Sequence, residues 1–192
     1  MASDIFSAWT TPSGNEPLIC LYDTRSGTRF MMKINEDLSY TVSTTFSNLN
    51  YVRSLCFKDN KVYMCIPSNG SNGPFIGTVD IGSNGNFVNP KETAITSLSH
   101  TATGYTGAEV YTNGTTVFGA FRYNGSPVET EFFSLNGTSY TKIKTVSGLS
   151  IGMVTYDAVR NCFVSFENNK LWVSENGLDW IEKGAISDYP AH

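Results

Sequence analysis

The feature that most constrains this chain of 192 residues is a repeated hairpin, whose best copy is LWVSENGLDW at residues 171–180. Its two apolar runs flank an Asn-Gly pair, the dipeptide that most strongly favours a tight turn between antiparallel strands. Weaker copies occur upstream as INEDLSY, GSNGNF and SLNGTSY. The aromatic residues that end the four copies, Tyr40, Phe87, Tyr140 and Trp180, are 47, 53 and 40 residues apart. The chain therefore repeats one β-unit four times.

Each repeat contains four short segments with strand character. The first segments are 4–9, 52–57, 108–111 and 152–156, and the second are 18–22, 62–66, 116–122 and 162–166. The third are 30–34, 75–81, 130–135 and 171–174, and the fourth are 39–45, 86–88, 139–146 and 180–183. Four strands in a repeat of about 40 to 50 residues are typical of a propeller blade. We predict an all-β, four-bladed β-propeller in one domain over 1–192, with blades near 3–46, 51–92, 106–147 and 150–184. The alternative is a partial propeller that oligomerisation completes.

The side-chain pattern also predicts which strands are buried. The second segments (LICLY, VYMCI, VFGAF and CFVSF) are continuously apolar, which favours burial on both faces. Small residues recur at matching points within them, namely Cys20, Cys65, Ala120 and Ser165, and this predicts close packing there. The four cysteines lack the CxxC or Cys/His spacing of metal sites. We therefore expect buried reduced thiols, with no metal and no cofactor.

The motif SENGLDW resembles the shortened Asp-box, the Ser-x-Asp-Gly-x-x-Trp hairpin of sialidase-like and related bacterial and phage β-propellers. Ser174, Asn176, Gly177 and Trp180 fill its positions, with Asn in place of Asp. Ser134, Asn136, Gly137 and Tyr140 fill them in the third repeat, with Tyr in place of Trp. In that family the box is a structural element at the outer turn of a blade, opposite most ligand sites. The resemblance implies a scaffold role for both sets, and we expect type I′ turns at both Asn-Gly pairs.

The long connections point to the opposite face. Residues 46–51, 67–74, 93–107 and 123–128 are expected to emerge together, and loops on a rigid scaffold are where binding usually occurs. Aromatic and arginine side chains are frequent anchors in recognition. The candidate ligand-binding residues in or beside these loops are Arg25, Arg29, Tyr51, Arg53, His100, Tyr105, Arg122 and Tyr123.

No catalytic constellation is legible in the sequence. A sialidase-like enzyme would need an arginine cluster and a Tyr nucleophile beside a Glu, and the Arg-Ile-Pro start of such enzymes is absent. A carboxylate pair for glycoside hydrolysis could be drawn from Glu109, Glu129, Glu131, Asp157 or Glu167, but context marks no pair. Glu129 and Glu131 alternate along a strand, which favours a solvated edge. We therefore expect no enzymatic activity.

The net charge of −4, without a Lys/Arg cluster, argues against a nucleic-acid partner. No apolar run reaches membrane-spanning length, and the start MASDIFSAW lacks a secretory signal, so we expect a virion or cytoplasmic location. The favoured function is a non-enzymatic binding module that recognises a host-surface glycan or a protein ligand through the long-loop face, and the resemblance to Asp-box propellers implies that it is a phage virion or tail protein. The alternatives are a structural or assembly propeller, which could form a homo-oligomer, and a small sialidase-like glycoside hydrolase.

Overall fold

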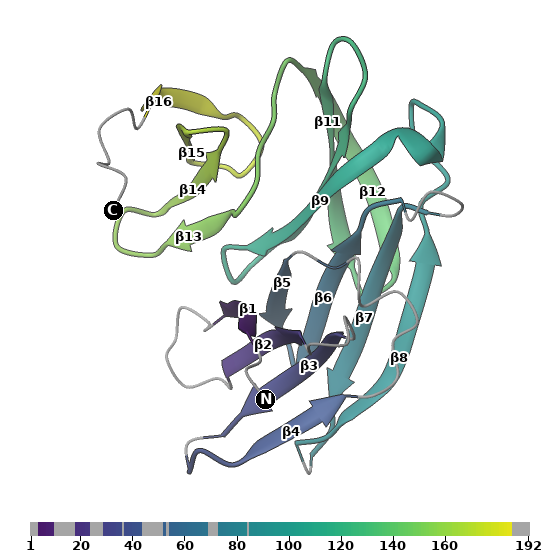
Figure 1. Ribbon diagram of the computed structural model, residues 1–192, viewed down its shortest axis with the longest axis vertical. Coiled ribbons are helices and arrows are strands. Elements are labelled where there is room, and N and C mark those ends of the chain that lie inside the picture. The colour runs from purple at the N-terminus through teal and green to yellow at the C-terminus, as the bar shows by residue number, and fades with distance from the viewer. Residues whose placement is uncertain are drawn as a thin grey trace.

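A computed structural model describes residues 4–9, 18–23, 29–35, 37–43, 52, 54–68, 73–83 and 85–185, with the backbone alone for 4–9, 18–23, 29–30 and 43. In this part of the chain, consecutive strands form four antiparallel sheets of four strands each (Figure 1). The all-β prediction is confirmed. Within the described residues, no helix has the length and apolar character that crossing a bilayer requires.

Most strands lie close to the predicted segments, but β8 continues to Ala94 instead of ending at residue 88, and β9 begins at Tyr105, within the predicted connection 93–107. The first sheet contains β1 (Asp4–Trp9), β2 (Leu18–Asp23), β3 (Arg29–Ile34) and β4 (Tyr40–Ser43). The second contains β5 (Leu55–Lys58), β6 (Lys61–Ile66), β7 (Phe75–Ile81) and β8 (Phe87–Ala94). The third contains β9 (Tyr105–Thr112), β10 (Val117–Tyr123), β11 (Glu129–Asn136) and β12 (Ser139–Ser147). The fourth contains β13 (Thr155–Asp157), β14 (Cys162–Glu167), β15 (Lys170–Ser174) and β16 (Ile181–Ala185). A short 3-10 turn, η2 (Ala102–Gly104), precedes β9.

Within each sheet the spatial order follows the chain order. The first strand of each sheet lies towards the middle of the molecule and the last lies towards the outside (Figure 1). Successive sheets are in contact through these inner strands, because β1 contacts β5, β5 and β6 contact β9, and β9 contacts β13. The four repeats read from the sequence are therefore four successive packing units.

The hydrophobic core lies between successive sheets. Tyr105, Phe121 and Phe133 pack with side chains of the second sheet, whereas Phe132 and Phe163 belong to a cluster that joins the third and fourth sheets. Burial of each such side chain contributes about 1.5–3 kcal/mol. Strand β6 is buried along almost its whole length, as its continuous apolar sequence predicts.

The predicted small positions are indeed crowded. Cys65, Ala120 and Ser165 are all buried, and Cys20 lies among the residues whose side chains are not described. Cys56, Cys65 and Cys162 are free and buried, which confirms the expectation of reduced thiols for these three. Burial raises the pKa of the Cys56 and Cys65 thiols, so both stay protonated at neutral pH.

The prediction of type I′ turns at the two Asn-Gly pairs is wrong. A type I′ turn needs positive φ at both central residues. Among the described residues, consecutive positive φ values occur instead at Asp59-Asn60 (52° and 56°) and at Asn168-Asn169 (52° and 59°). At the Asn-Gly pairs only the glycines are positive, Gly137 at 60° and Gly177 at 78°.

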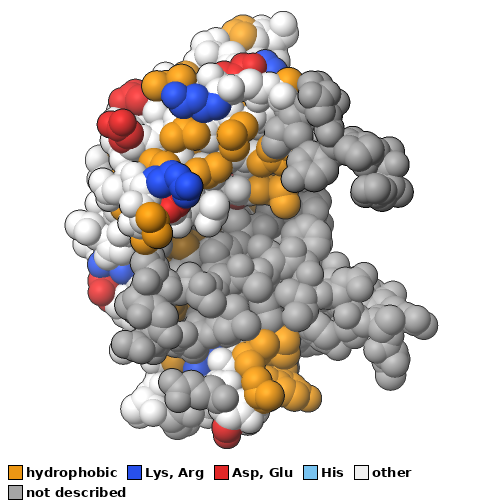
Figure 2. Space-filling view, turned by 90° about the vertical axis from the view of Figure 1, so that its left-hand side faces the viewer, with side chains coloured by type: hydrophobic (Ala, Val, Ile, Leu, Met, Phe, Trp, Pro, Cys, Tyr) orange, Lys and Arg blue, Asp and Glu red, His pale blue; other side chains and the backbone are white. Residues whose placement is uncertain are grey.

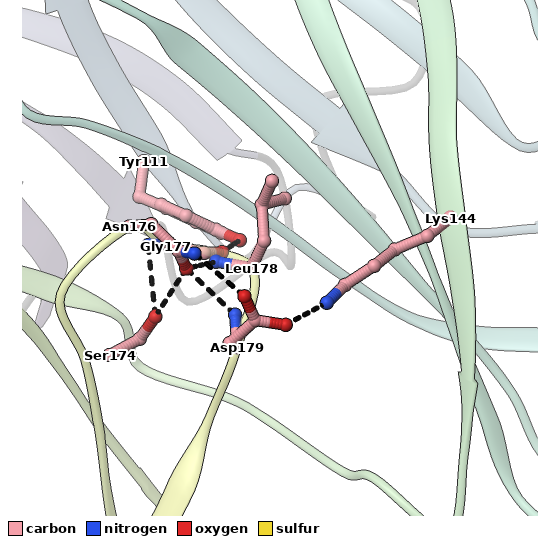
Figure 3. Close-up of polar contacts among 7 residues, drawn as sticks. All are labelled: Tyr111, Lys144, Ser174, Asn176, Gly177, Leu178 and Asp179. Carbon is pink, nitrogen blue, oxygen red and sulfur yellow. Dashed lines mark hydrogen bonds and ion pairs between the residues drawn. The ribbon is translucent and has the colours of Figure 1, made fainter.

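The Asn176 turn departs from type I′ because its side chains satisfy the backbone directly. Asn176 Oδ1 accepts hydrogen bonds from the amides of Leu178 (2.9 Å) and Asp179 (2.8 Å) (Figure 3). Ser174 Oγ accepts one from the Gly177 amide at 2.9 Å. Such Asx and Ser turns replace a backbone turn, so the loop widens and β16 begins after Trp180.

Side chains of the third sheet hold this turn in place. The buried Tyr111 hydroxyl donates to the Gly177 carbonyl at 2.7 Å, and Lys144 pairs with Asp179 (Figure 3). The third repeat has a counterpart, because the Gly137 amide donates to the Tyr63 hydroxyl of the second sheet at 3.2 Å. The turns at Gly177 and Gly137, which we call the box-like turns, are therefore each hydrogen-bonded to the preceding sheet, as expected for a structural element.

The surface of the fourth sheet carries apolar side chains. Figure 2 views the molecule from the side on which this sheet lies in Figure 1, and hydrophobic side chains gather in its upper part among Lys or Arg side chains. Met153, Val159 and Ile181 are among the exposed large hydrophobic residues of this segment. An exposed apolar surface is compatible with protein contacts on this side.

Candidate functional site

The structure describes half of the predicted ligand-binding residues. Arg25, Tyr51 and Arg53 lie outside the described residues, and Arg29 begins β3 with its side chain not described. The other four, His100, Tyr105, Arg122 and Tyr123, lie at one end of the third sheet. They do not form one site, because consecutive strand residues point to opposite faces and Arg122 precedes Tyr123 on β10.

His100, Tyr105 and Tyr123 form what we call the aromatic cluster. The His100 ring stacks on Tyr123 with 4.0 Å between ring centroids and 8° between planes. Tyr105 is paired with Tyr123 across β9 and β10, and its ring is tilted against Tyr123 at 5.6 Å. Tyr105 is fully buried, whereas His100 and Tyr123 are half-buried. His100 and Tyr123 therefore form a partly exposed aromatic surface, and the buried Tyr105 ring packs beneath it.

Three loops converge on this cluster. The Asn124 amide donates to the Gly104 carbonyl, and the Ser68 amide donates to the Tyr105 carbonyl, each at 3.0 Å. Two glycines make room for the Tyr123 ring. A Cβ at Gly104 would lie 2.2 Å from Tyr123 Cε2, and one at Gly125 would lie 2.1 Å from Cε1. The described parts of three predicted long connections therefore meet beside predicted site residues, and the fourth, 46–51, lies outside the described residues.

Carboxylates lie directly beneath the aromatic cluster. Glu129 Oε2 is 2.6 Å from His100 Nε2. Glu131, on the same strand face, is fully buried, pairs with Lys142, and accepts hydrogen bonds from Tyr105 and from the Ser99 amide. The prediction that Glu129 and Glu131 form a solvated edge is wrong. Strand β11 lies between β10 and β12 in its sheet, so it is not an edge strand, and the segment before η2 folds over it.

The electrostatics of Glu131 favour its ionised form. Burial raises the pKa of this carboxyl, but Lys142, the Tyr105 hydroxyl and the Ser99 amide together outweigh burial and bring the pKa below its ordinary value. Burial and the adjacent carboxylate raise the pKa of Tyr105, which therefore stays a hydrogen-bond donor. Glu131 thus fixes Tyr105 and, through it, the support of the outer rings.

Arg122 lies on the other face of the third sheet and joins it to the fourth. Its Nη1 donates to Glu167 Oε1 at 2.6 Å and to Ser150 Oγ at 2.9 Å. Gly107 lies opposite Arg122 on β9, where a Cβ would be 3.0 Å from the Arg122 Nε. Arg122 is therefore already paired, and it does not face the aromatic cluster.

Two of the candidate carboxylates, Glu109 and Glu167, lie close together beside Arg122, a pairing that the sequence did not mark. A Cβ at Gly152 would lie 2.4 Å from Glu167 Oε2 and 3.9 Å from Glu109 Oε1, so these two oxygens are at most about 6.3 Å apart, the sum of the two distances. Glu109 Oε2 is covered and has no hydrogen-bond partner. Burial raises the pKa of Glu109 to about 7, against weaker lowering effects of the Met153 backbone and the Ser54 hydroxyl.

The two carboxyls of this pair have different surroundings. Glu167 is paired with Arg122, whereas burial of Glu109 lets this carboxyl hold a proton over most of the acidic range. The sequence carried only a weak signal for this pair, a Glu within the buried strand β9. Glu167 comes from another sheet, and no local pattern joins the two.

The described residues contain no group of three or more His, Cys, Asp or Glu side chains that could hold a metal ion. Comparison with known proteins gives no family to guide the assignment, because no protein-family model matches the chain and no curated protein matches it significantly. The functional argument therefore rests on the geometry of the aromatic cluster and of the carboxylate pair.

Proposed function

We propose that the four sheets are the blades of a four-bladed β-propeller and that the protein is a glycan-binding module. Two observations support the propeller: each sheet packs on the next in chain order, and the first strands lie innermost (Figure 1). The Asp-box-like turns at Asn136 and Asn176 agree with it. Their resemblance to boxes in phage propellers suggests a virion or tail protein that recognises the host surface.

The single observation that carries the binding proposal is the half-exposed stack of His100 on Tyr123. A sugar ring presents an apolar face of C–H groups that packs on an aromatic face, and its hydroxyls need hydrogen-bond partners around the rim. The Tyr123 hydroxyl makes no hydrogen bond to a described residue, and Glu129 lies beside His100. The ionisable groups beside this surface are already paired with one another, which favours a neutral glycan.

The proposed role of this cluster is binding without a catalytic step. The histidine is engaged with Glu129, and Glu131 is buried beneath Tyr105, so neither carboxylate is presented to a ligand as a nucleophile. We therefore propose a binding role for the cluster without metal or cofactor, with a host-surface glycan as its partner.

A glycan array with the labelled protein tests this proposal. The wild type should retain a discrete set of glycans, and Tyr123→Ala should lose them because the stack is removed. Tyr123→Phe keeps the ring and should lose only part of the affinity, by about 0.5–1.5 kcal/mol for one hydrogen bond. Tyr40→Ala is the matched control, since Tyr40 is 67% exposed on the first sheet. Equal retention by wild type and Tyr123→Ala, with both variants folded, would refute the site.

A second candidate function, glycoside hydrolysis, is suggested by the proximity of Glu109 and Glu167, since one oxygen of each lies within about 6.3 Å of the other. Retaining glycosidases hold their two carboxyls about 5–5.5 Å apart, one protonated and one ionised. Release of nitrophenol from chromogenic glycosides, abolished in both Glu109→Gln and Glu167→Gln, would support this function. No turnover across a broad glycoside panel would leave the carboxylate pair as a link between the third and fourth sheets.

A further inference from the structure

A groove that the binding proposal does not use lies between β12 and the turn that joins β15 to β16. Its volume is about 370 Å³. Two indoles, Trp172 and Trp180, line it together with the apolar Val146 and Leu178. Lys144 and Asp179 also line it and pair with each other across it (Figure 3). The groove is thus formed by the box-like turn and by the strand to which this turn is fastened.

Both indoles carry an unused hydrogen-bond donor. Trp172 Nε1 and Trp180 Nε1 are covered and have no hydrogen-bond partner. Trp180 packs edge-on against the buried Tyr111, with 6.1 Å between the ring centroids. A buried donor that lacks a partner costs about 1–3 kcal/mol. Because both nitrogens are covered, a ligand in the groove would contact the exposed parts of the two rings and not these donors.

The charges at the groove are balanced. Asp179 pairs with Lys144 and also accepts a hydrogen bond from Asn176 Nδ2 at 2.7 Å. The ion pair offers donors and acceptors without a net charge, so it does not select an anion or a cation. Aromatic walls, apolar contacts and a few polar groups within a small volume match a ligand that is itself amphipathic and neutral.

We propose that this groove binds one short saccharide of a neutral glycan, at a site separate from the aromatic cluster. The volume lies at the small end of the range of about 300–1,000 Å³ for ligand pockets, which favours one or two sugar units over a longer ligand. The indole faces would hold the C–H face of the sugar, and Lys144 and Asp179 would exchange hydrogen bonds with its hydroxyls. Two sites on one module would raise avidity for a repeating surface glycan.

Tryptophan fluorescence provides the test, because two of the three tryptophans of the chain line the groove. The probes are maltose, cellobiose, lactose and diacetylchitobiose, titrated to about 10 mM, which detects binding as weak as about −4 kcal/mol. At least one disaccharide should shift the emission saturably and protect it from acrylamide quenching. Asp179→Asn and Lys144→Met should each weaken this response by about tenfold, or roughly 1.4 kcal/mol, with melting temperature as the check on folding.

Two controls separate this site from the aromatic cluster. Tyr123→Ala should leave the fluorescence response unchanged, and a response that it abolishes would assign the binding to the aromatic cluster and overturn the proposal. An absence of response to all four disaccharides, or a response only to an apolar peptide, would also overturn it. Neither result would affect glycan retention that depends on Tyr123.

Discussion

Replacing Glu109 by Gln should change how the stability of the fold depends on pH. Burial raises the pKa of Glu109 to about 7 from its ordinary 4.5. Below pH 4.5 this carboxyl is protonated in both the folded and the unfolded chain, so its ionisation does not affect folding. Between pH 4.5 and about 7 the unfolded chain ionises first, and the free energy of unfolding falls as the pH rises.

The size of this fall follows from the same interval. At 1.36 kcal/mol per pKa unit, the interval from 4.5 to about 7 corresponds to about 3 kcal/mol. Glutamine has nearly the same shape and no charge, so Glu109→Gln lacks this loss. The variant should therefore gain up to about 3 kcal/mol relative to wild type between pH 4.5 and pH 8, with little further change above that.

Urea unfolding of both proteins at half-unit pH steps measures this difference, and the subtraction removes every other group that titrates equally in both. Glu175→Gln is the matched control, because Glu175 is exposed on the β15–β16 turn. Its difference from wild type should stay constant. A constant difference for Glu109→Gln as well would mean that the folded protein already ionises Glu109, and the reasoning about its burial would be wrong.

Three further changes test the packing of the sheets, each by urea unfolding. Asn176→Ala removes the acceptor for two turn amides and should lower the free energy of unfolding by about 1–2 kcal/mol; no loss would contradict the Asx turn. Tyr111→Phe should cost about 1–3 kcal/mol, because the Gly177 carbonyl loses its donor. Lys142→Met should cost about 3–5 kcal/mol by leaving the Glu131 carboxylate buried and unpaired. Adding Glu131→Gln to Lys142→Met should recover much of that loss, and an equal or larger loss in the double variant would contradict the ion pair.

The strands could be predicted because their signals are local. Continuous apolar runs such as VYMCI, the alternation in SYTKIKTV and the turn residues between them lie within a few residues of one another. The sequence also pointed correctly to the crowded position at Ala120 and to the long connections that meet beside Tyr105. These are properties of one repeat, and a repeat can be compared with its copies.

The candidate site was harder to predict because it depends on contacts between segments far apart in the chain. The His100–Tyr123 stack needs the segment before η2 to fold over the third sheet, and the Glu109–Glu167 pair joins two sheets. One error came from the end of a strand. Strand β10 continues to Tyr123, one residue beyond the predicted segment 116–122, and a strand extended this far would have placed Arg122 and Tyr123 on opposite faces. The prediction of a type I′ turn failed at Asn176 because the side chain of this residue accepts hydrogen bonds from the turn backbone.

The most direct test of the binding face is an amide chemical-shift titration with a glycan that the array selects. The account predicts that the largest shifts occur at His100, Gly104, Asn124 and Gly125, which surround the Tyr123 ring, and that they disappear in Tyr123→Ala. Saturable binding that leaves these four amides unchanged and perturbs only other parts of the protein would contradict the assignment of the ligand to the long-loop face.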